Sequence, residues 1–159
     1  MSDDFAEFAA SELPRLVRLA RLLTGNAEDA WDLTQDCLVR VGLRWNRIDR
    51  DGNPGAYARV TLVNLSKNLR RSRSRERKRM RALVSGTPNS TIPAPLPEWL
   101  NHVLATLTPQ QRAAIALRYL EDLDDTAIAG ILNCSEVTVR SHISRGLARL
   151  RDAAPGGRD

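Results

Sequence analysis

The chain has 159 residues, of which 42% are apolar and 27% are charged, and its net charge is +5. This balance is typical of a soluble folded protein with room for one ordinary domain or two small ones. No run reaches the roughly 18 apolar residues that span a membrane, and the acidic start, MSDDFAEFAASEL, is unlike a signal peptide. The two cysteines, Cys37 and Cys134, are too few for a disulfide scaffold or a zinc cluster. We therefore expect a cytoplasmic protein with reduced thiols, no metal and no cofactor.

The positive charge is concentrated in one short segment. Residues 67–81, KNLRRSRSRERKRMR, hold nine basic residues and one acidic residue, whereas residues 1–66 and 82–159 have net charges of −2 and −1. A basic block between nearly neutral segments favours a polyanionic partner, most often a nucleic acid. From charge alone, a solvated and partly disordered run is the alternative.

A proline-rich segment divides the chain. Residues 85–97, SGTPNSTIPAPLP, contain four prolines and cannot form a helix or a central strand. We therefore predict two domains, residues 1–81 and 98–152, joined by a flexible linker at 82–97 and followed by a tail at 153–159. The linker has no apolar stripe that would dock it, so we expect a mobile arrangement of the two domains.

Apolar residues at helical spacing predict two helices before residue 45. Gly25 is a stop signal for the first, and Pro14 marks either its first turn or a break in it. The apolar stripe of the first helix is Leu13, Leu16, Ala20 and Leu23. That of the second is Ala30, Leu33, Thr34, Cys37, Leu38 and Val41. We expect Cys37 to be a buried structural thiol, because it lies on this stripe.

The segment NRIDRDGNPG, residues 46–55, is rich in turn formers and predicts a loop. Asn53 is a natural N-cap and Pro54 a natural first residue for a third helix, which runs to about residue 72 or beyond. Its apolar face is Ala58, Leu62, Leu65 and Leu69. No segment has the sustained alternation of a strand. The predicted fold class is therefore all-α, with two small helical domains joined by the proline-rich linker.

Capping residues mark the helices of the C-terminal domain. Thr108 and Gln111 have the spacing of a capping box, Asp124 or Asp125 caps a short helix, and Ser135 caps a final helix. The apolar stripe of the final helix is Val139, Ile143, Leu147 and Leu150. A short helix, a tight turn and a longer helix have the geometry of a helix-turn-helix.

The second helix of such a motif enters the major groove of DNA. Arg140 and Arg145 suit guanine edges or phosphates, and Thr138 and Ser141 can donate to phosphates or bases. The residues that face away from the apolar stripe or flank it are Thr138, Arg140, Ser141, Ser144 and Arg145. On spacing alone, the solvated face of an ordinary helical bundle remains an alternative.

Two runs of sequence resemble one known family. The run beginning LPEWLNHVLATLTPQQR and ending EVTVRSHISRGLARLR resembles the −35-binding domain of the extracytoplasmic-function, or group 4, sigma factors of the sigma-70 family. The segments LTGNAEDAWDLTQDCLVRVGLRW and NPGAYARVTLVNLSKNLRR resemble their other domain, which binds core RNA polymerase and melts the −10 element. The pattern is closest to a small subfamily common in actinobacteria. The resemblance implies a sigma factor that directs promoter-specific initiation, with no enzymatic activity of its own.

The resemblance also implies roles for particular residues. Asp32, Gln35 and Asp36 match positions that dock on the clamp helices of the polymerase β′ subunit, and the β subunit is a further contact of the family. Without the resemblance, these residues would be a solvated acidic face. Many relatives are also held inactive by an anti-sigma factor, which is a further candidate partner.

For DNA, the resemblance implies contacts from both domains. The residues matching the helix that meets the −10 element are Asn64, Lys67, Asn68, Arg70 and Arg71. The loop at 47–55 matches one that captures a flipped-out base, and Tyr57 is a core or stacking aromatic. The residues matching the face toward the −35 element are Thr138, Arg140, Ser141, Ser144 and Arg145. Arg112 matches a family position with a DNA-backbone or structural role.

Three positions depart from the family pattern, and two other functions stay open. Val137 stands where the family usually has glycine, Ala127 where it commonly has glutamate, and Glu136 adds a negative charge at the start of the recognition helix. A stand-alone helix-turn-helix regulator would bind an operator through residues 108–150, but it leaves the N-terminal resemblance unexplained. An inactive sigma-like adaptor is the other alternative. No nucleophile motif, phosphate-binding loop or metal box supports an enzyme.

Overall fold

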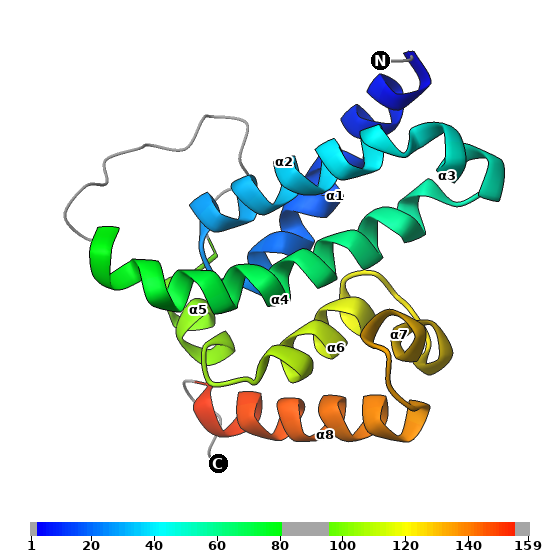
Figure 1. Ribbon diagram of the computed structural model, residues 1–159. Coiled ribbons are helices and arrows are strands. Elements are labelled where there is room, and N and C mark those ends of the chain that lie inside the picture. Colours follow the sequence, from blue (N-terminus) through cyan, green and yellow to red (C-terminus); the bar gives the residue numbers. More distant parts are fainter. Residues whose placement is uncertain (1–2, 81–95, 155–159) are drawn as a thin grey trace.

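The computed structural model describes residues 3–80 and 96–154, and every regular element within these ranges is a helix (Figure 1). The N-terminal half consists of α1 (Asp3–Thr24), α2 (Ala27–Leu43), α3 (Trp45–Asp51) and α4 (Pro54–Met80). The C-terminal half consists of α5 (Glu98–Leu104), α6 (Pro109–Tyr119), α7 (Asp125–Leu132) and α8 (Glu136–Ala153). The all-α prediction is confirmed. The predicted linker lies outside the described residues except for Leu96 and Pro97.

The first helix is longer than the sequence predicts. α1 begins at Asp3 and continues through Pro14, which neither starts nor breaks it. Proline inside a helix removes one backbone hydrogen bond. Burial compensates for this loss, because Leu16, Leu19 and Leu23 pack into the core that α1 shares with α2 and α4.

The predicted loop at 46–55 is wrong for its first part, because residues 46–51 belong to α3. Trp45 and Ile48 are buried, and the Trp45 ring lies 5.4 Å from Phe5 and 5.0 Å from Phe8 between centroids. These contacts hold a segment of turn-forming residues in a helix. Only the turn that follows fits the prediction: Gly52 has a φ of 90° and ends α3.

Side-chain caps begin most of the remaining helices, as predicted. The Asn53 side chain accepts from the Ala56 amide at 3.0 Å, and Thr108 and Gln111 form both hydrogen bonds of a capping box. Asp124, rather than Asp125, caps α7. Ser135 caps α8. α4 extends to Met80, which agrees with the predicted end at about residue 72 or beyond.

The two halves pack against each other, through α6 on α1 and α7 on α4 (Figure 1). The buried Arg112 of α6 donates to the Leu104 carbonyl at 3.2 Å and to the Leu23 carbonyl at 3.3 Å. Glu121, just after α6, pairs with Arg15 of α1 and Arg59 of α4. The expected mobile arrangement is therefore wrong for this structure, because α6 and α7 dock it without the linker. Arg112 has a structural role, and its burial excludes a DNA-backbone role in this state.

Candidate functional site

An exposed stripe runs along the outer side of α2. The predicted polymerase-binding residues Asp32, Gln35 and Asp36 are all exposed there. The stripe continues with two apolar side chains that were not predicted, Val39 and Leu43, which are 59% and 81% exposed. Asp32, Asp36, Val39 and Leu43 follow spacings of four, three and four residues, so they lie on one face. This spacing, off the buried stripe of the same helix, is a signal that the sequence already contained.

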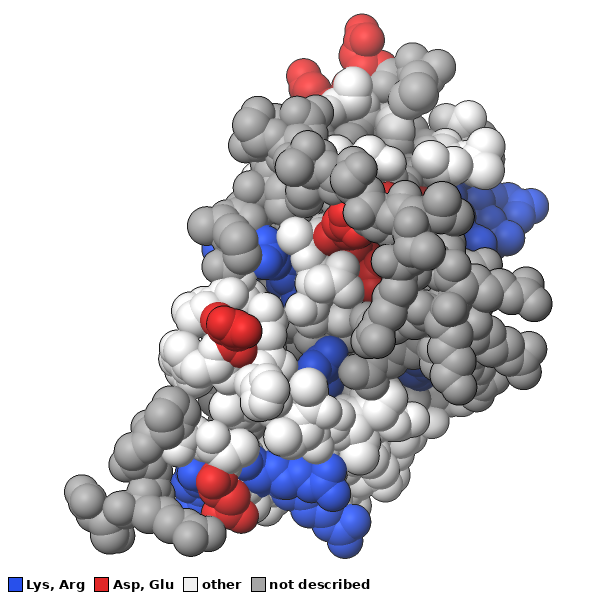
Figure 2. Space-filling view, turned by 90° about the vertical axis from the view of Figure 1, so that its left-hand side faces the viewer, with Lys and Arg blue, Asp and Glu red and all other residues white. Residues whose placement is uncertain are grey.

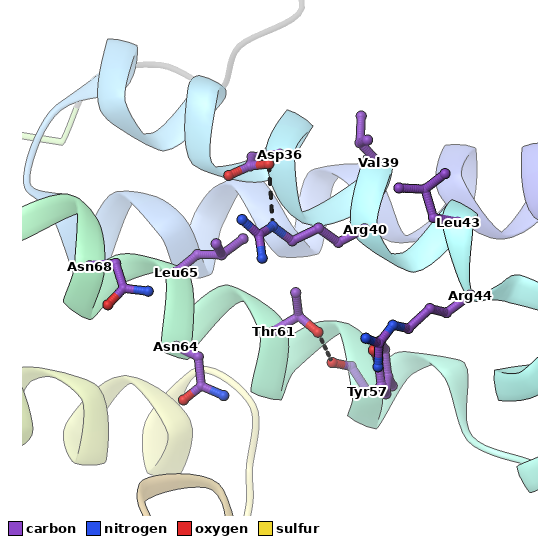
Figure 3. Close-up of a pocket in the computed structure, with 10 residues that line it drawn as sticks. All are labelled: Asp36, Val39, Arg40, Leu43, Arg44, Tyr57, Thr61, Asn64, Leu65 and Asn68. Carbon is purple, nitrogen blue, oxygen red and sulfur yellow. Dashed lines mark hydrogen bonds and ion pairs between the residues drawn. The ribbon is translucent and has the colours of Figure 1, made fainter.

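A groove of about 590 Å³ separates this stripe from α4 (Figure 3). Asp36 of α2 lines it, together with Asn64 and Asn68 from successive turns of α4 (Figure 3). Its lining is Asp36, Val39, Arg40, Leu43, Arg44, Tyr57, Thr61, Asn64, Leu65 and Asn68. Arg40 pairs with Asp36 at 3.5 Å between Nε and Oδ1, an exposed pair of the kind that contributes little stability. The groove therefore joins a predicted protein-binding surface to a predicted nucleic-acid-binding surface.

The other predicted −10 residues lie on the same helix. Lys67 is half-buried, one turn after Asn64. Arg70 and Arg71 lie farther along α4, and their side chains are outside the described part of the structure. All the predicted −10 residues therefore belong to one helix, α4.

A second cavity, of about 320 Å³, lies between α3 and the start of α4. Its lining is Arg44, Arg47, Ile48, Asn53 and Tyr57. The loop predicted to capture a base supplies Arg47, Ile48 and Asn53 of this cavity. Tyr57 lines both cavities and also packs against the core. The core role of Tyr57 is therefore confirmed, and stacking on a base stays a prediction.

The helix-turn-helix consists of α7 and α8, joined at Asn133, whose φ of 57° and ψ of 53° make the tight left-handed turn. Val139 is fully buried and turns its side of α8 toward α6 and α7. Ser144, Arg140 and Arg145 are exposed, and Ser141 is half-buried. The basic side chains at the foot of the molecule in Figure 2 belong to α8, the lowest helix of Figure 1.

Two polar contacts hold the recognition helix against α7: Asp125 accepts from Arg140 at 3.2 Å between Nη1 and Oδ2, and Thr126 donates to the Glu136 carboxylate. The other oxygen of Asp125 pairs with Arg118 of α6. The pairing of Asp125 with Arg140 was not predicted, because the two residues are distant in the chain. The side chain of Thr138, a predicted contact to DNA, already shares a hydrogen bond of 2.8 Å with the Ser135 hydroxyl.

The thiol of Cys37 is buried, as expected, and donates to the Ala58 carbonyl at 3.3 Å. Burial raises the pKa of this thiol to about 12, and the adjacent Asp36 carboxylate contributes in the same direction. Within the described ranges, no cluster of three or more His, Cys, Asp or Glu residues could hold a metal ion. None of the described helices is long and apolar enough to cross a membrane.

Residues 8–76 match the family Sigma-70 region 2, and residues 98–150 match Sigma-70, region 4. The RNA polymerase sigma-E factor of Streptomyces coelicolor is 33% identical to this chain, over 94% of this chain and 85% of the relative. The chain belongs to the sigma-70 family. The ECF RNA polymerase sigma factor SigL of Mycobacterium tuberculosis is 30% identical, over 86% of this sigma factor and 80% of the relative.

A solved structure shares the arrangement of the sigma factor over nearly its whole length. It is a chain from the co-crystal structure of the sigma factor RpoE with the anti-sigma factor NepR from Bartonella quintana. The TM-score is 0.75 at 26% identity, over 96% of this sigma factor and 97% of that chain. The region 2 match explains the N-terminal half, which a stand-alone helix-turn-helix regulator leaves unexplained. Sigma factors are transcription initiation factors rather than enzymes.

Proposed function

We propose that this sigma factor binds core RNA polymerase in the cytoplasm through the exposed stripe of α2. The stripe combines the carboxylates of Asp32 and Asp36 with the apolar Val39 and Leu43. Its partner must therefore offer basic and apolar side chains along one ridge, and in the family this partner is the pair of β′ clamp helices. The exposure of Leu43 beside Val39 is the observation that carries the proposal, because adjoining apolar side chains bordered by charged groups are the usual make-up of a protein interface.

The adjoining groove is the proposed site for the −10 element. Asn64 and Asn68 project from α4 beside the stripe, so a bound polymerase would hold single-stranded DNA next to them. Amide side chains pair well with base edges. Lys67, Arg70 and Arg71 would follow the phosphates along the same helix. The cavity beside Tyr57 would take a flipped base.

The outward face of α8 is the proposed site for the −35 element. Arg140 and Arg145 flank that face, with Ser141 and Ser144 between them, and the Thr138 hydroxyl lies beside the Ser135 cap. Arginines can form bidentate hydrogen bonds with guanine in the major groove. The remaining hydrogen-bonding capacity of the Arg140 fork stays available beyond its bond to Asp125.

The packed arrangement must open before both promoter elements are bound. α7 packs against both α4 and α8, so at about 10 Å for each packed pair the two outer helices approach within about 20 Å of each other. The −35 and −10 elements are about 25 base pairs apart, or about 85 Å along the duplex. The contacts of Arg112 and Glu121 between the halves must therefore break on the promoter.

An anti-sigma factor is a proposed partner of the packed state. The similar sigma-factor structure was solved with an anti-sigma factor and matches both halves of this chain together. This likeness supports a partner that holds regions 2 and 4 in the packed arrangement.

Reconstitution with core polymerase of the native host tests the proposed function. We expect stoichiometric co-elution on gel filtration and specific transcripts from the holoenzyme. Asp32→Ala/Asp36→Ala should abolish co-elution, whereas the charge-matched control Asp3→Ala/Asp4→Ala should retain it. Arg140→Ala/Arg145→Ala should retain co-elution and lose −35-dependent initiation. A chain that binds core polymerase but never initiates would be the inactive adaptor.

A further inference from the structure

The first turn of the recognition helix exposes an apolar side chain at the centre of its outward face. Val137 is 67% exposed, whereas Val139, two residues later, is fully buried and points into the domain. At about 100° per residue, Val137 lies roughly 160° around the helix from Val139. Ser141 and Ser144 lie within about 40° of Val137 on the same side. Val137 and Ser144, which are exposed, and the half-buried Ser141 therefore share the side of α8 that faces away from Val139.

The side chain of Val137 is held in place before any ligand binds. Its β-branched shape restricts rotation within a helix. The Ser135 cap fixes the first turn of α8, and the Glu136 side chain contacts Thr126 of α7. Binding would therefore cost little side-chain entropy at this position.

The surroundings of Val137 do not suit an apolar protein partner. Its neighbours on the outward face are Arg140, Ser141 and Ser144, so the methyl groups form an isolated apolar spot in a polar surface. The other large apolar residues that are exposed in the described structure belong to α2, α5 and α6. An interface core would need a contiguous apolar patch.

The major groove offers one apolar group, the C5 methyl of thymine. We propose that Val137 selects a thymine in the −35 element through contact with this methyl, an inference that rests on the proposed role of α8. Val137 precedes Ser141 by about 6 Å along the helix, which corresponds to about two base-pair steps. The thymine therefore lies about two base pairs from the position that Ser141 faces, toward the end that the α8 N-terminus enters.

The test removes the methyl from each partner in turn. Holoenzyme first selects −35 sequences from a promoter duplex whose −35 region is randomised. In the selected duplex, each −35 thymine on either strand is then replaced singly by deoxyuridine, which lacks only the C5 methyl. We expect one replacement to weaken binding of the wild-type holoenzyme about threefold to fivefold. The Val137→Ala holoenzyme should bind the two duplexes equally, and Val137→Thr, which keeps one methyl, should show an intermediate difference.

Each outcome decides one question. A selected element without thymine, or deoxyuridine effects that are the same for wild type and Val137→Ala, would overturn the reading by Val137. If Arg140→Ala/Arg145→Ala still abolishes −35 binding in that case, the proposed role of α8 stands. If that double variant binds like wild type, the role of α8 itself fails. Because Val137 is exposed, an unchanged thermal midpoint of Val137→Ala serves as the folding control.

Discussion

The carboxylate of Glu121 lies 3.0 Å from Nε of Arg15, and this ion pair joins the C-terminal half of the sigma factor to α1. The Glu121 side chain is only 1% exposed, and Arg59 of α4 approaches the same oxygen at 3.6 Å. A buried carboxylate is stable only next to such cations, because removal from water disfavours its charge. Glu121 therefore stabilises the packed arrangement of the two halves, because only in that arrangement do Arg15 and Arg59 lie beside its charge.

Replacing Glu121 with glutamine should weaken the packing of the two halves. Removing one partner of a buried ion pair is destabilising, and the partial exposure of Arg15 reduces the expected loss of unfolding free energy to about 1–3 kcal/mol. Urea unfolding measures this loss, and small-angle X-ray scattering should show a larger radius of gyration. The control is Asp122→Asn, which makes the same charge change at the exposed neighbour. Equal effects of the two variants would contradict the role of Glu121.

Replacing Leu43 with serine should weaken binding to core polymerase without weakening the fold. Leu43 is 81% exposed, so its substitution should change the unfolding free energy by less than about 0.5 kcal/mol. Loss of its contact with polymerase should lower the affinity about tenfold, as truncation of an interface anchor does. Fluorescence titration with core polymerase measures this change. The control is Tyr119→Ser, at an exposed residue of α6, which should bind core polymerase normally. Normal binding by Leu43→Ser would show that the apolar part of the stripe does not contact polymerase.

Replacing Asp125 with asparagine should free Arg140 for DNA. The carboxylate of Asp125 holds Arg140 in the present structure, so its neutralisation exposes one more cation on the outward face. We expect tighter binding to a non-specific duplex, with a slope of log affinity against log salt that steepens by up to about one. Fluorescence anisotropy at several salt concentrations measures both quantities. Asp124→Asn, which retains the cap, controls for charge, and identical slopes for the two variants would contradict the prediction.

The stability of the sigma factor should fall with rising pH partly through Cys37. The pKa of its thiol is raised to about 12 in the folded protein, above the ordinary value of 9.0. The unfolded chain therefore loses this proton first. The contribution to stability is complete below about pH 9 and decreases as the pH rises toward 12. Between pH 9 and pH 10, wild type should lose about 1 kcal/mol more unfolding free energy than Cys37→Ala. Parallel pH profiles of the two proteins in urea unfolding would show that the thiol keeps its ordinary pKa.

Local signals in the sequence predicted most helix boundaries. The caps at Asn53, Thr108 and Ser135 were predictable because each acts within three residues of itself. The helix α3 was not, because its residues favour turns and only the burial of Trp45 and Ile48 against distant residues makes it helical.

The candidate site was predictable only in part. Polar residues of α2 and α8 stand out by chemistry, and the structure places Asp36, Arg140 and Ser144 at the surface. Val39 and Leu43 were missed, because an apolar residue next to a buried stripe is expected to be buried with it. The exposure of Leu43 follows from which side of α2 packs on α1 and α4.

The sequence by itself determined the helices other than α3, most of their caps and the family of this protein, because periodicity and motif spacing are properties of neighbouring residues. Only the tertiary structure decided that the two halves pack together, that Arg112 is buried between them and that Asp36 shares a groove with Asn64. Arg112 and Leu23 are separated by 89 positions in the chain, and no local pattern encodes a hydrogen bond over that separation. Such contacts depend on how complete helices fit against one another, because the free energy of packing belongs to surfaces brought together by folding.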